Sequence, residues 1–354
     1  MTLLAGAPAP LFSAPSHVNP NFAFGSLGGR YILMAFLPGP GPELDAAAGL
    51  ILRHRAEFRD AERVFFGVLP DEATFRDRAG DALPLRWFGD WSGEVRRLYG
   101  AVDAAGGVQP QWVLIDPSLR IMGTAPLDQG PAAVAHLLGL GHPDGHAGVA
   151  MHAPVLIAPR IFEPALCRRL IDLYQADGGV PSGVMRERDG RTVGVLSDFK
   201  KRRDATIDDP GLLAQIRTSL LRRLLPEIEK AFQFRATKIE RFIVACYDAA
   251  DGGYFRPHRD NTTGGTAHRQ FAVSINLNAE EFEGGDLRFP EFGSRTYRPP
   301  TGGAVVFSCS VLHEATPVTR GVRYAFLPFL YDDAAAELRA RNKHLVDLEA
   351  QPGG

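Results

Sequence analysis

Cysteine is scarce in this sequence, and the three that occur, Cys167, Cys246 and Cys309, are odd in number and widely spaced. Such a set argues against a disulfide framework and indicates a reducing compartment. No apolar run approaches the roughly 20 residues that a membrane-spanning helix needs. The first residues lack a basic segment, and prolines interrupt their apolar stretch, so we expect no signal peptide. We therefore expect a cytoplasmic protein without a membrane partner.

An excess of charge of either sign is also absent. The formal net charge is −2 over 354 residues, which provides no general attraction to nucleic acid or to an anionic membrane. We therefore expect no nucleic-acid partner. Hydrophobic residues make up 45% and charged residues 23%, as in ordinary globular proteins, and a chain of this length can form two domains with separate cores.

The first part of the chain alternates apolar runs with helical patterns, after a proline-containing lead-in that favours an extended conformation. The apolar runs predict strands at 31–36, 63–69, 85–90 and 111–116. The helical patterns predict helices at 43–58 and 131–140, and a short helix after Asp71. Strands separated by helices indicate βαβ units and a largely parallel sheet.

Three motifs in this region resemble those of a peroxiredoxin of the alkyl hydroperoxide reductase class: Asp90-Trp91-Ser92-Gly93, Arg97-Leu98-Tyr99-Gly100 and Trp112-Val113-Leu114-Ile115-Asp116-Pro117. The resemblance implies an α/β thioredoxin-like domain over residues 1–140. In that family a nucleophilic cysteine follows the strand that here is 31–36, but this sequence has no cysteine before Cys167. Because a thiol peroxidase requires a thiolate, we expect a non-catalytic domain kept for binding or for homodimer formation.

Residues 139–153 are rich in glycine, alanine and histidine and show no periodicity, so we place a linker at 141–153. His142 and Asp144 fit a His-x-Asp pattern, and His146 and His152 add to an apparent metal cluster. Pro143 and the nearby glycines offer no rigid scaffold. We interpret these side chains as exposed linker histidines.

The remaining segment, 154–354, begins with a predicted strand at 154–162 and a helix at 163–177, followed by a mobile hairpin or loop at 182–194. The basic run Lys200–Arg203 could steer an acidic substrate, but we interpret it as a solvated charged turn. After the helix-starting pair Asp209-Pro210, apolar residues at helical spacing predict a core face: Leu212, Leu213, Ile216, Leu220, Leu221, Leu224 and Leu225.

From Lys238 onward, β-type runs follow one another with glycine- and proline-rich turns and no helices between them. This pattern indicates an antiparallel sandwich or jelly roll, and with the preceding helices an α+β domain. The segment 334–350 predicts a final amphipathic helix.

Two histidines and an aspartate in this β region are spaced for one metal. His258 and Asp260 point to the same side of an extended strand, and His313 ends a later apolar strand. Three such ligands on one face of an octahedral ion leave the other face open. Arg323, on the following strand, offers the planar fork that binds a carboxylate; Arg320 competes for this role, but strand alternation favours Arg323. The alternative, buried structural histidines, does not explain this conjunction.

The same stretches resemble the Fe(II)- and 2-oxoglutarate-dependent oxygenases of the prolyl 4-hydroxylase type over about residues 154–332. The matching motifs are Val244-Ala245-Cys246-Tyr247, Gly253-Tyr254, His258-Arg259-Asp260, Ser274-Ile275-Asn276-Leu277-Asn278, Gly284-Gly285-Asp286-Leu287-Arg288-Phe289-Pro290, His313-Glu314, Pro317-Val318 and Gly321 with Arg323-Tyr324. One departure is Pro257 directly before the first histidine, which predicts a strand edge or a bulge there.

The resemblance implies a double-stranded β-helix core and assigns roles to residues. His258, Asp260 and His313 match the iron ligands, and Arg323 matches the residue that binds the distal carboxylate of 2-oxoglutarate. Tyr247 matches a tyrosine that assists that contact, although it could equally be a half-buried strand aromatic. Asn276 falls on a pocket-lining position, although it could simply bond a neighbour.

The activity implied is hydroxylation of a C–H bond with O2, releasing succinate and CO2, with L-ascorbate as reductant. The expected substrate is a prolyl or other side chain of a protein or peptide. A free amino acid or small metabolite is the alternative substrate, and a non-catalytic protein that binds 2-oxoglutarate or senses oxygen is the alternative function. We expect the loops at 182–208 and 261–270 to determine substrate selectivity.

Overall fold

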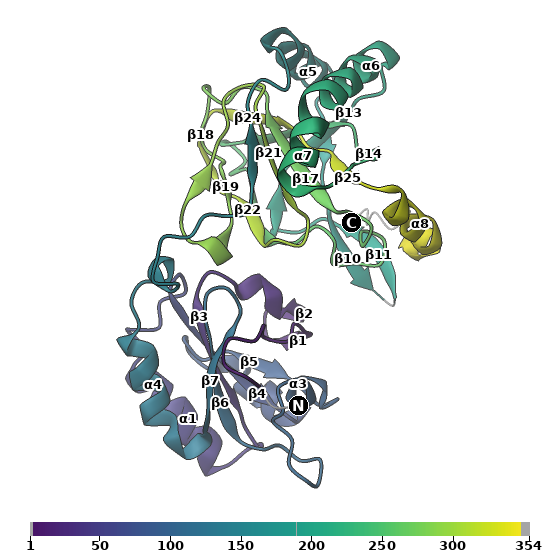
Figure 1. Cartoon of the computed structure of the whole chain (residues 1–354). Helices are drawn as coiled ribbons and strands as arrows, with labels where there is room; N and C mark the ends of the chain where they lie inside the picture. The colour runs from purple at the N-terminus through teal and green to yellow at the C-terminus, as the bar shows by residue number, and fades with distance from the viewer. Residues whose placement is uncertain (1–2, 189, 348–354) are drawn as a thin grey trace. The chain divides into compact units, whose positions relative to one another are not determined.

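The computed structural model describes residues 3–188 and 190–347, and the chain has a two-domain, sheet-rich architecture (Figure 1). One compact unit consists of Met1–Ala153 with Pro290–Ser294, and the other of Pro154–Phe289 with Arg295–Gly354. In the part of the chain that the structure describes, no helix combines the length and apolar character required to cross a bilayer.

A five-stranded sheet forms the centre of the N-terminal unit. Its spatial order is β5 (Trp87–Gly89), β4 (Arg63–Leu69), β3 (Tyr31–Phe36), β6 (Gln111–Ile115) and β7 (Ile121–Pro126). β3, β4 and β5 are parallel, as predicted, but β6 and β7 pair antiparallel to their neighbours. The expectation of a largely parallel sheet is therefore wrong for this edge. The Asp116 carboxylate accepts hydrogen bonds from the backbone N–H groups of Ser118 and Arg120, which forms a tight turn between β6 and β7.

Four helices accompany this sheet: α1 (Pro42–Arg53), α2 (Glu72–Asp77), α3 (Glu94–Leu98) and α4 (Gly130–Gly139). α1 ends earlier than the predicted 43–58. α2 begins after Asp71, whose carboxylate accepts from the Thr74 backbone N–H, as expected for an N-cap. Every residue of β3 and β4 is buried, which explains why their sequences are continuous apolar runs. The lead-in adds a short hairpin of β1 (Ser13–Ser16) and β2 (Asn19–Ala23).

The segment predicted as a linker has more structure than expected. Pro143–Gly145 form a short 3-10 helix, and Pro143 is buried. His142 and His152 are exposed, as expected, but His146 is half-buried, with Nε2 2.7 Å from Ser118 Oγ and Nδ1 2.8 Å from the Pro143 carbonyl. Among the described residues, the grouping that could hold a metal does not include these histidines.

The two largest sheets of the C-terminal unit are antiparallel. The larger, nine-stranded sheet contains β14 (Lys238–Glu240), β25 (Phe329–Tyr331), β17 (Phe271–Asn276), β24 (Val322–Phe326), β15 (Ile243–Asp248), β13 (Arg203–Thr206) and β9 (Val180–Pro181), with β21 (Ala304–Ser308) and β8 (Leu156–Ala158) branching from β17. The smaller, five-stranded sheet contains β12 (Lys200–Lys201), β16 (Tyr254–His258), β22 (His313–Ala315), β19 (Leu287–Arg288) and β20 (Thr296–Tyr297).

Helices pack on the larger sheet and bury its main core. They are α5 (Pro164–Asp177), α6 (Pro210–Ser219), a π-helical turn at Leu220–Leu224, and α7 (Leu225–Phe232). Leu212, Ile216, Leu220 and Leu224 are buried among strand residues, and Leu213 and Leu225 pack against them, as predicted. Leu221 is 58% exposed, so its assignment to the core face was wrong.

Two further predictions concern the ends of this unit. The expected hairpin at 182–194 is confirmed as β10 (Val184–Arg188) paired with β11 (Arg191–Val195). The predicted helix at 334–350 is shorter: α8 spans Asp333–Arg341, and a 3-10 turn leads into β26 (Val346–Asp347), which pairs with β11. Residues 348–350 of that prediction lie outside the described residues.

Candidate metal centre and carboxylate pocket

Two histidines lie opposite each other on neighbouring antiparallel strands of the smaller sheet. His258 ends β16, His313 begins β22, and the two are paired in register. The register shifts between Phe255 and His258, which agrees with the strand edge or bulge predicted from Pro257. The ring centroids of the two histidines are 4.3 Å apart.

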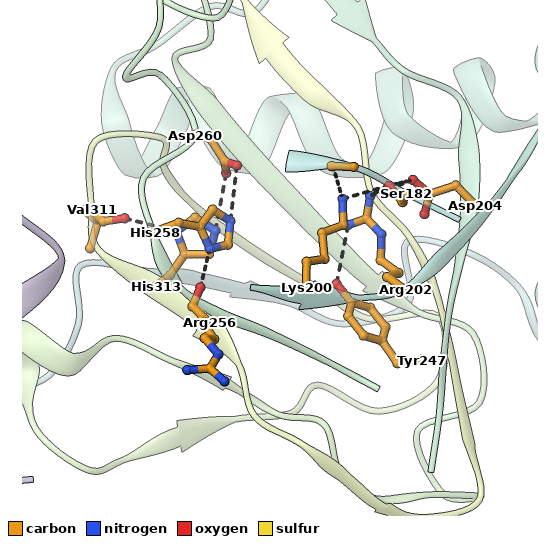
Figure 2. A network of polar contacts seen from close by, with 11 residues as sticks. Ser182, Lys200, Arg202, Asp204, Tyr247, Arg256, His258, Asp260, Val311 and His313 are labelled. Carbon is orange, nitrogen blue, oxygen red and sulfur yellow. Dashed lines mark hydrogen bonds and ion pairs between the residues drawn. The ribbon is translucent and has the colours of Figure 1, made fainter. Parts of the chain in front are cut away.

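Asp260 completes this cluster from just beyond the end of β16. Its backbone N–H donates to the Cys309 carbonyl at 2.9 Å, which fixes the segment against the end of β21. The Asp260 carboxylate oxygens lie 3.5 Å from His258 Nε2 and 3.3 Å from His313 Nε2 (Figure 2). Adjacent ligands of an octahedral ion are about 3 Å apart for metal–ligand bonds of about 2.1 Å, so this donor set fits one face of such an ion.

Hydrogen bonds to the other ring nitrogens select the histidine tautomers. His258 Nδ1 lies 2.8 Å from the Arg256 carbonyl, and His313 Nδ1 lies 3.0 Å from the Val311 carbonyl (Figure 2). A carbonyl only accepts, so each Nδ1 carries the proton and each Nε2 presents a lone pair toward Asp260. This is the arrangement that a metal-binding histidine requires.

The protonation states also suit a cation. Burial, and then the neighbouring imidazole of His258, lower the pKa of His313 to about 4, so its ring is neutral at pH 7. Burial alone would raise the pKa of Asp260, but the imidazoles, His313 first, hold it well below the usual range. A neutral histidine and an ionised aspartate are the forms that bind a metal.

Arg323 occupies the adjacent larger sheet. It lies on β24, pairs in register with Tyr247 on β15, and is only 3% exposed. One terminal nitrogen donates to Ser274 Oγ at 2.8 Å, while Nε is buried without a hydrogen-bond partner. The guanidinium carbon lies 5.2 Å from the centre of the Tyr247 ring. A buried guanidinium with an unused donor is suited to a carboxylate ligand.

The alternative arginine does not reach this pocket. Arg320 is exposed and forms an ion pair with Glu283 at 2.6 Å. Asn276 is buried, but it is not among the residues that line the pocket, in contrast to the prediction. Its amide nitrogen instead donates to the Pro299 carbonyl at 2.9 Å. Ser274, two positions earlier on the same face of β17, lies at the pocket.

The basic run at 200–203 is not a solvated turn, and that interpretation was wrong. Lys200 and Arg202 are 8% and 7% exposed, whereas Lys201 and Arg203 face solvent. Arg202 forms an ion pair with Asp204 at 2.6 Å and donates to Ser182 Oγ at 3.1 Å and to Tyr247 Oη at 3.4 Å (Figure 2). Lys200 donates to Ser182 Oγ at 2.7 Å. The alternation of buried and exposed side chains follows the two-residue period of a strand.

One pocket connects these groups. The metal-type cluster, Arg323, Tyr247 and Ser274 all line it, together with Arg202, Arg241 and an apolar wall that includes Phe255, Phe307, Leu327 and Phe329. Arg202, Arg241 and Ser274 were not identified from the sequence as site residues. Strand alternation was the one signal that could have revealed Arg202.

Comparison with known proteins gives a family for this unit. Residues 242–331 match the family model of the 2OG-Fe(II) oxygenase superfamily. A PKHD-type hydroxylase of Synechococcus sp. (strain JA-2-3B'a(2-13)) is 30% identical over 97 residues, which are 26% of this chain and 42% of the relative. A PKHD-type hydroxylase of Stutzerimonas stutzeri is 29% identical over 147 residues, or 39% of this chain and 64% of the relative. The chain thus spans less than two thirds of the length of each.

Solved structures with similarity to this chain include two hydroxylases. A prolyl hydroxylase from Trichoplax adhaerens, in complex with a hypoxia inducible factor peptide fragment, is 20% identical, with a TM-score of 0.41 over 53% of this chain and 86% of that one. A Pseudomonas putida prolyl-4-hydroxylase is 21% identical, with a TM-score of 0.38 over 53% and 96%. Mycobacterium tuberculosis AhpC is 18% identical, with a TM-score of 0.34 over 39% and 92%.

The family match covers the strands that carry His258, Asp260, His313 and Arg323. The family description names Fe(II) and 2-oxoglutarate, and the described residues contain a His-Asp-His cluster of the matching donor type. The C-terminal unit of this chain therefore contains a domain of the 2OG-Fe(II) oxygenase superfamily.

Proposed function

We propose that this protein is an Fe(II)- and 2-oxoglutarate-dependent dioxygenase that hydroxylates a C–H bond. The observation that carries the proposal is the convergence of two imidazoles and a carboxylate in the same pocket as a buried guanidinium with an unused Nε. Neither feature alone has this meaning, because isolated buried histidines and arginines are often structural.

Each residue has a role in this proposal. His258, Asp260 and His313 would hold Fe(II) through two Nε2 atoms and a carboxylate oxygen. Arg323 would bind the distal carboxylate of 2-oxoglutarate, with Ser274 and Tyr247 beside it. When bound, iron, 2-oxoglutarate and O2 supply the oxidation that releases succinate and CO2. The apolar wall of the pocket would lower the local dielectric constant, which would strengthen the contacts made by these charged groups.

The network behind Tyr247 positions it for this role. Arg202 donates to Tyr247 Oη, and Asp204 and Ser182 hold Arg202 in turn. With its oxygen accepting from Arg202, the Tyr247 hydroxyl has its proton available for a ligand carboxylate. This contact supports the proposal that Tyr247 assists in binding the ligand carboxylate.

The proposed substrate is a prolyl or other side chain of a protein or peptide. The support is the family match and the description of the relatives as PKHD-type hydroxylases. A free amino acid or small metabolite is the alternative substrate, and L-ascorbate is the proposed reductant. The loss of the cysteine nucleophile in the N-terminal unit favours a second candidate function, a non-catalytic protein that binds 2-oxoglutarate or senses oxygen.

The two folds are also part of the proposal. We propose that the two large antiparallel sheets of the C-terminal unit, whose strands β16, β22 and β24 carry site residues, form a double-stranded β-helix. The parallel strands β3 to β5 with the antiparallel β6 and β7 support the proposal of a thioredoxin-like domain. We assign that unit a non-catalytic role in binding or in homodimer formation, in a cytoplasmic protein.

Succinate formation from 2-oxoglutarate, with Fe(II) and ascorbate, tests this function. Wild type should form succinate, His258→Ala should not, and His142→Ala, which alters the other His-x-Asp motif, should match wild type. Equal rates in wild type and His258→Ala, or none in wild type with candidate peptides present, would instead support the non-catalytic alternative.

A further inference from the structure

Arg241 lines the pocket and forms no salt bridge with any of the described residues, although Asp204 and Asp260 attract it at longer range. It lies between β14 and β15 and lines the same cavity as His258, Asp260 and Arg323. Its φ of 71° is left-handed, an uncommon conformation for a side chain of this size. Its Nε is buried and has no hydrogen-bond partner. The guanidinium carbon instead lies 5.0 Å from the centre of the Phe329 ring, a cation–π distance.

Neighbouring arginines differ from Arg241 in this respect. Arg202 pairs with Asp204 at 2.6 Å, and Arg269, which also stacks on Phe329, pairs with Glu240 at 2.7 Å. Burial, and then the positive charge of Arg202, lower the pKa of Arg241 to about 10, so it remains charged at neutral pH. Arg241 is half-buried, and a partly desolvated cation without a salt-bridge partner is receptive to an anion.

Arg241 and Arg323 approach the pocket at different points along β17. Ala272 on β17 pairs with Phe329, on which Arg241 stacks, whereas Arg323 bonds Ser274, two residues further on. Two residues of a strand span about 7 Å. Asp260 lies near the end of the pocket that is formed by Ala272 of β17. Its backbone N–H donates to the Cys309 carbonyl, and the Cys309 N–H donates to the carbonyl of Gln270, which directly precedes β17. Arg241 is therefore at the metal-ligand end of the pocket.

With Fe(II) and 2-oxoglutarate bound, the pocket would carry one unbalanced positive charge. Arg202, Arg241 and Arg323 contribute three positive charges, and Asp204 and Asp260 two negative charges. A ferrous ion adds two positive charges, and dianionic 2-oxoglutarate on Arg323 removes two. One positive charge remains at Arg241, and a further carboxylate would neutralise it.

We infer that Arg241 is a second carboxylate-binding residue of this pocket, distinct from Arg323 and next to the metal ligands. The inference rests on the proposed function, since it assigns the distal carboxylate of 2-oxoglutarate to Arg323. The carboxylate on Arg241 has two sources. The leftover positive charge favours the substrate itself, which would then be an acidic molecule or an acidic peptide segment. The other source is the carboxylate of 2-oxoglutarate next to its keto group, whose charge the sum above already includes.

Binding without turnover tests the inference on the full chain loaded with Zn(II). Titration calorimetry gives the affinity for 2-oxoglutarate in wild type, Arg241→Gln and the conservative Arg241→Lys. Ligand-observed NMR then compares N-acetyl amino acids with their amides, which lack the carboxylate, in the presence and absence of 2-oxoglutarate. Arg269→Gln is the matched control, because Arg269 stacks on the same ring but already has a carboxylate partner. Thermal unfolding checks that each variant is folded.

The loss of a charge-assisted contact predicts an affinity about 10- to 100-fold weaker in Arg241→Gln, with Arg241→Lys between that variant and wild type. If Arg241→Gln binds the N-acetyl amino acids more weakly but their amides equally well, the carboxylate on Arg241 comes from the substrate. If Arg241→Gln binds 2-oxoglutarate more weakly, the carboxylate comes from the keto acid. Unchanged binding of every carboxylate in Arg241→Gln, or an equal effect in Arg269→Gln, would overturn the inference. Failure of wild type to bind 2-oxoglutarate would contradict the proposed function, while the acid and amide pairs would still test Arg241.

Discussion

His258 and His313 face each other across paired strands, and each ring donates its Nδ1 proton to the carbonyl of the residue two positions before it, Arg256 and Val311. The backbone therefore fixes both tautomers and both ring orientations before any ion is present. Because these acceptors are main-chain atoms, this part of the site depends on the conformation of the two strand ends and not on other side chains. A site prepared in this way needs little rearrangement to bind a metal.

Replacing the two candidate arginines separately tests which of them binds the keto acid. Arg323→Gln should raise the KM for 2-oxoglutarate by about 10- to 100-fold, because a charge-assisted contact in a buried pocket is lost. Arg320→Gln should leave the KM unchanged, because Arg320 is exposed and pairs with Glu283 outside the pocket. The measurement is succinate formation against 2-oxoglutarate concentration. An equal KM increase in both variants would contradict the assignment to Arg323.

The buried Arg202–Asp204 pair should contribute strongly to stability. Asp204→Asn leaves the Arg202 charge buried with a weaker partner, and removal of one member of such a pair costs about 3–5 kcal/mol. Chemical denaturation, followed by a probe in the C-terminal unit, measures the change. Glu283→Gln, which breaks an exposed pair, is the control and should have little effect. A similar small change in both variants would show that the buried pair is not a structural requirement.

Acid should destabilise the C-terminal unit through Glu240. Burial alone would raise the pKa of Glu240, but hydrogen bonds and charge from His268 and Arg269 lower it to about 2. A depressed carboxyl pKa adds stability above the unfolded-state value of about 4.3, and this stability is lost as the pH falls toward 2. The loss is on the order of 2 to 3 kcal/mol.

The comparison of wild type with Glu240→Gln isolates this effect, since glutamine keeps the shape but does not titrate. Metal-free protein avoids a contribution from metal release. Between pH 5 and pH 2, as an approximate window set by the two pKa values, wild type should lose its stability advantage over the variant. A constant difference across that range would show that Glu240 does not titrate with folding.

The metal cluster could be predicted from the sequence because its spacing reflects local geometry. His258 and Asp260 are two positions apart at the end of β16, and His313 and Arg323 lie on the later strands β22 and β24, so the spacing along the sequence already suggests the cluster. The strands 31–36 and 63–69 were equally clear, because continuous apolar runs of that length are typical of buried strands.

The rest of the pocket depends on which strands become neighbours, and the sequence does not state this. Arg202 reaches Tyr247 because β13 pairs with β15. Arg241 itself has a left-handed backbone conformation, and its side chain stacks on Phe329 at the pocket. The short basic run at 200–203 has the composition of a solvated turn. The pairing of β12 with β16 and of β13 with β15 instead buries every second side chain of the run. For Asn276 the sequence left a pocket position and a bond to a neighbour open, and the structure shows its amide donating to the Pro299 carbonyl.

Iron content after anaerobic reconstitution tests the central claim most directly. Purified protein, incubated with Fe(II) and then freed of excess metal, should retain one iron per chain in wild type, and Asp260→Ala, which removes the carboxylate between the two histidines, should retain almost none. His142→Ala should match wild type. Retention of no iron by wild type, or of equal iron by wild type and Asp260→Ala, would contradict the assignment of His258, Asp260 and His313 as the metal site.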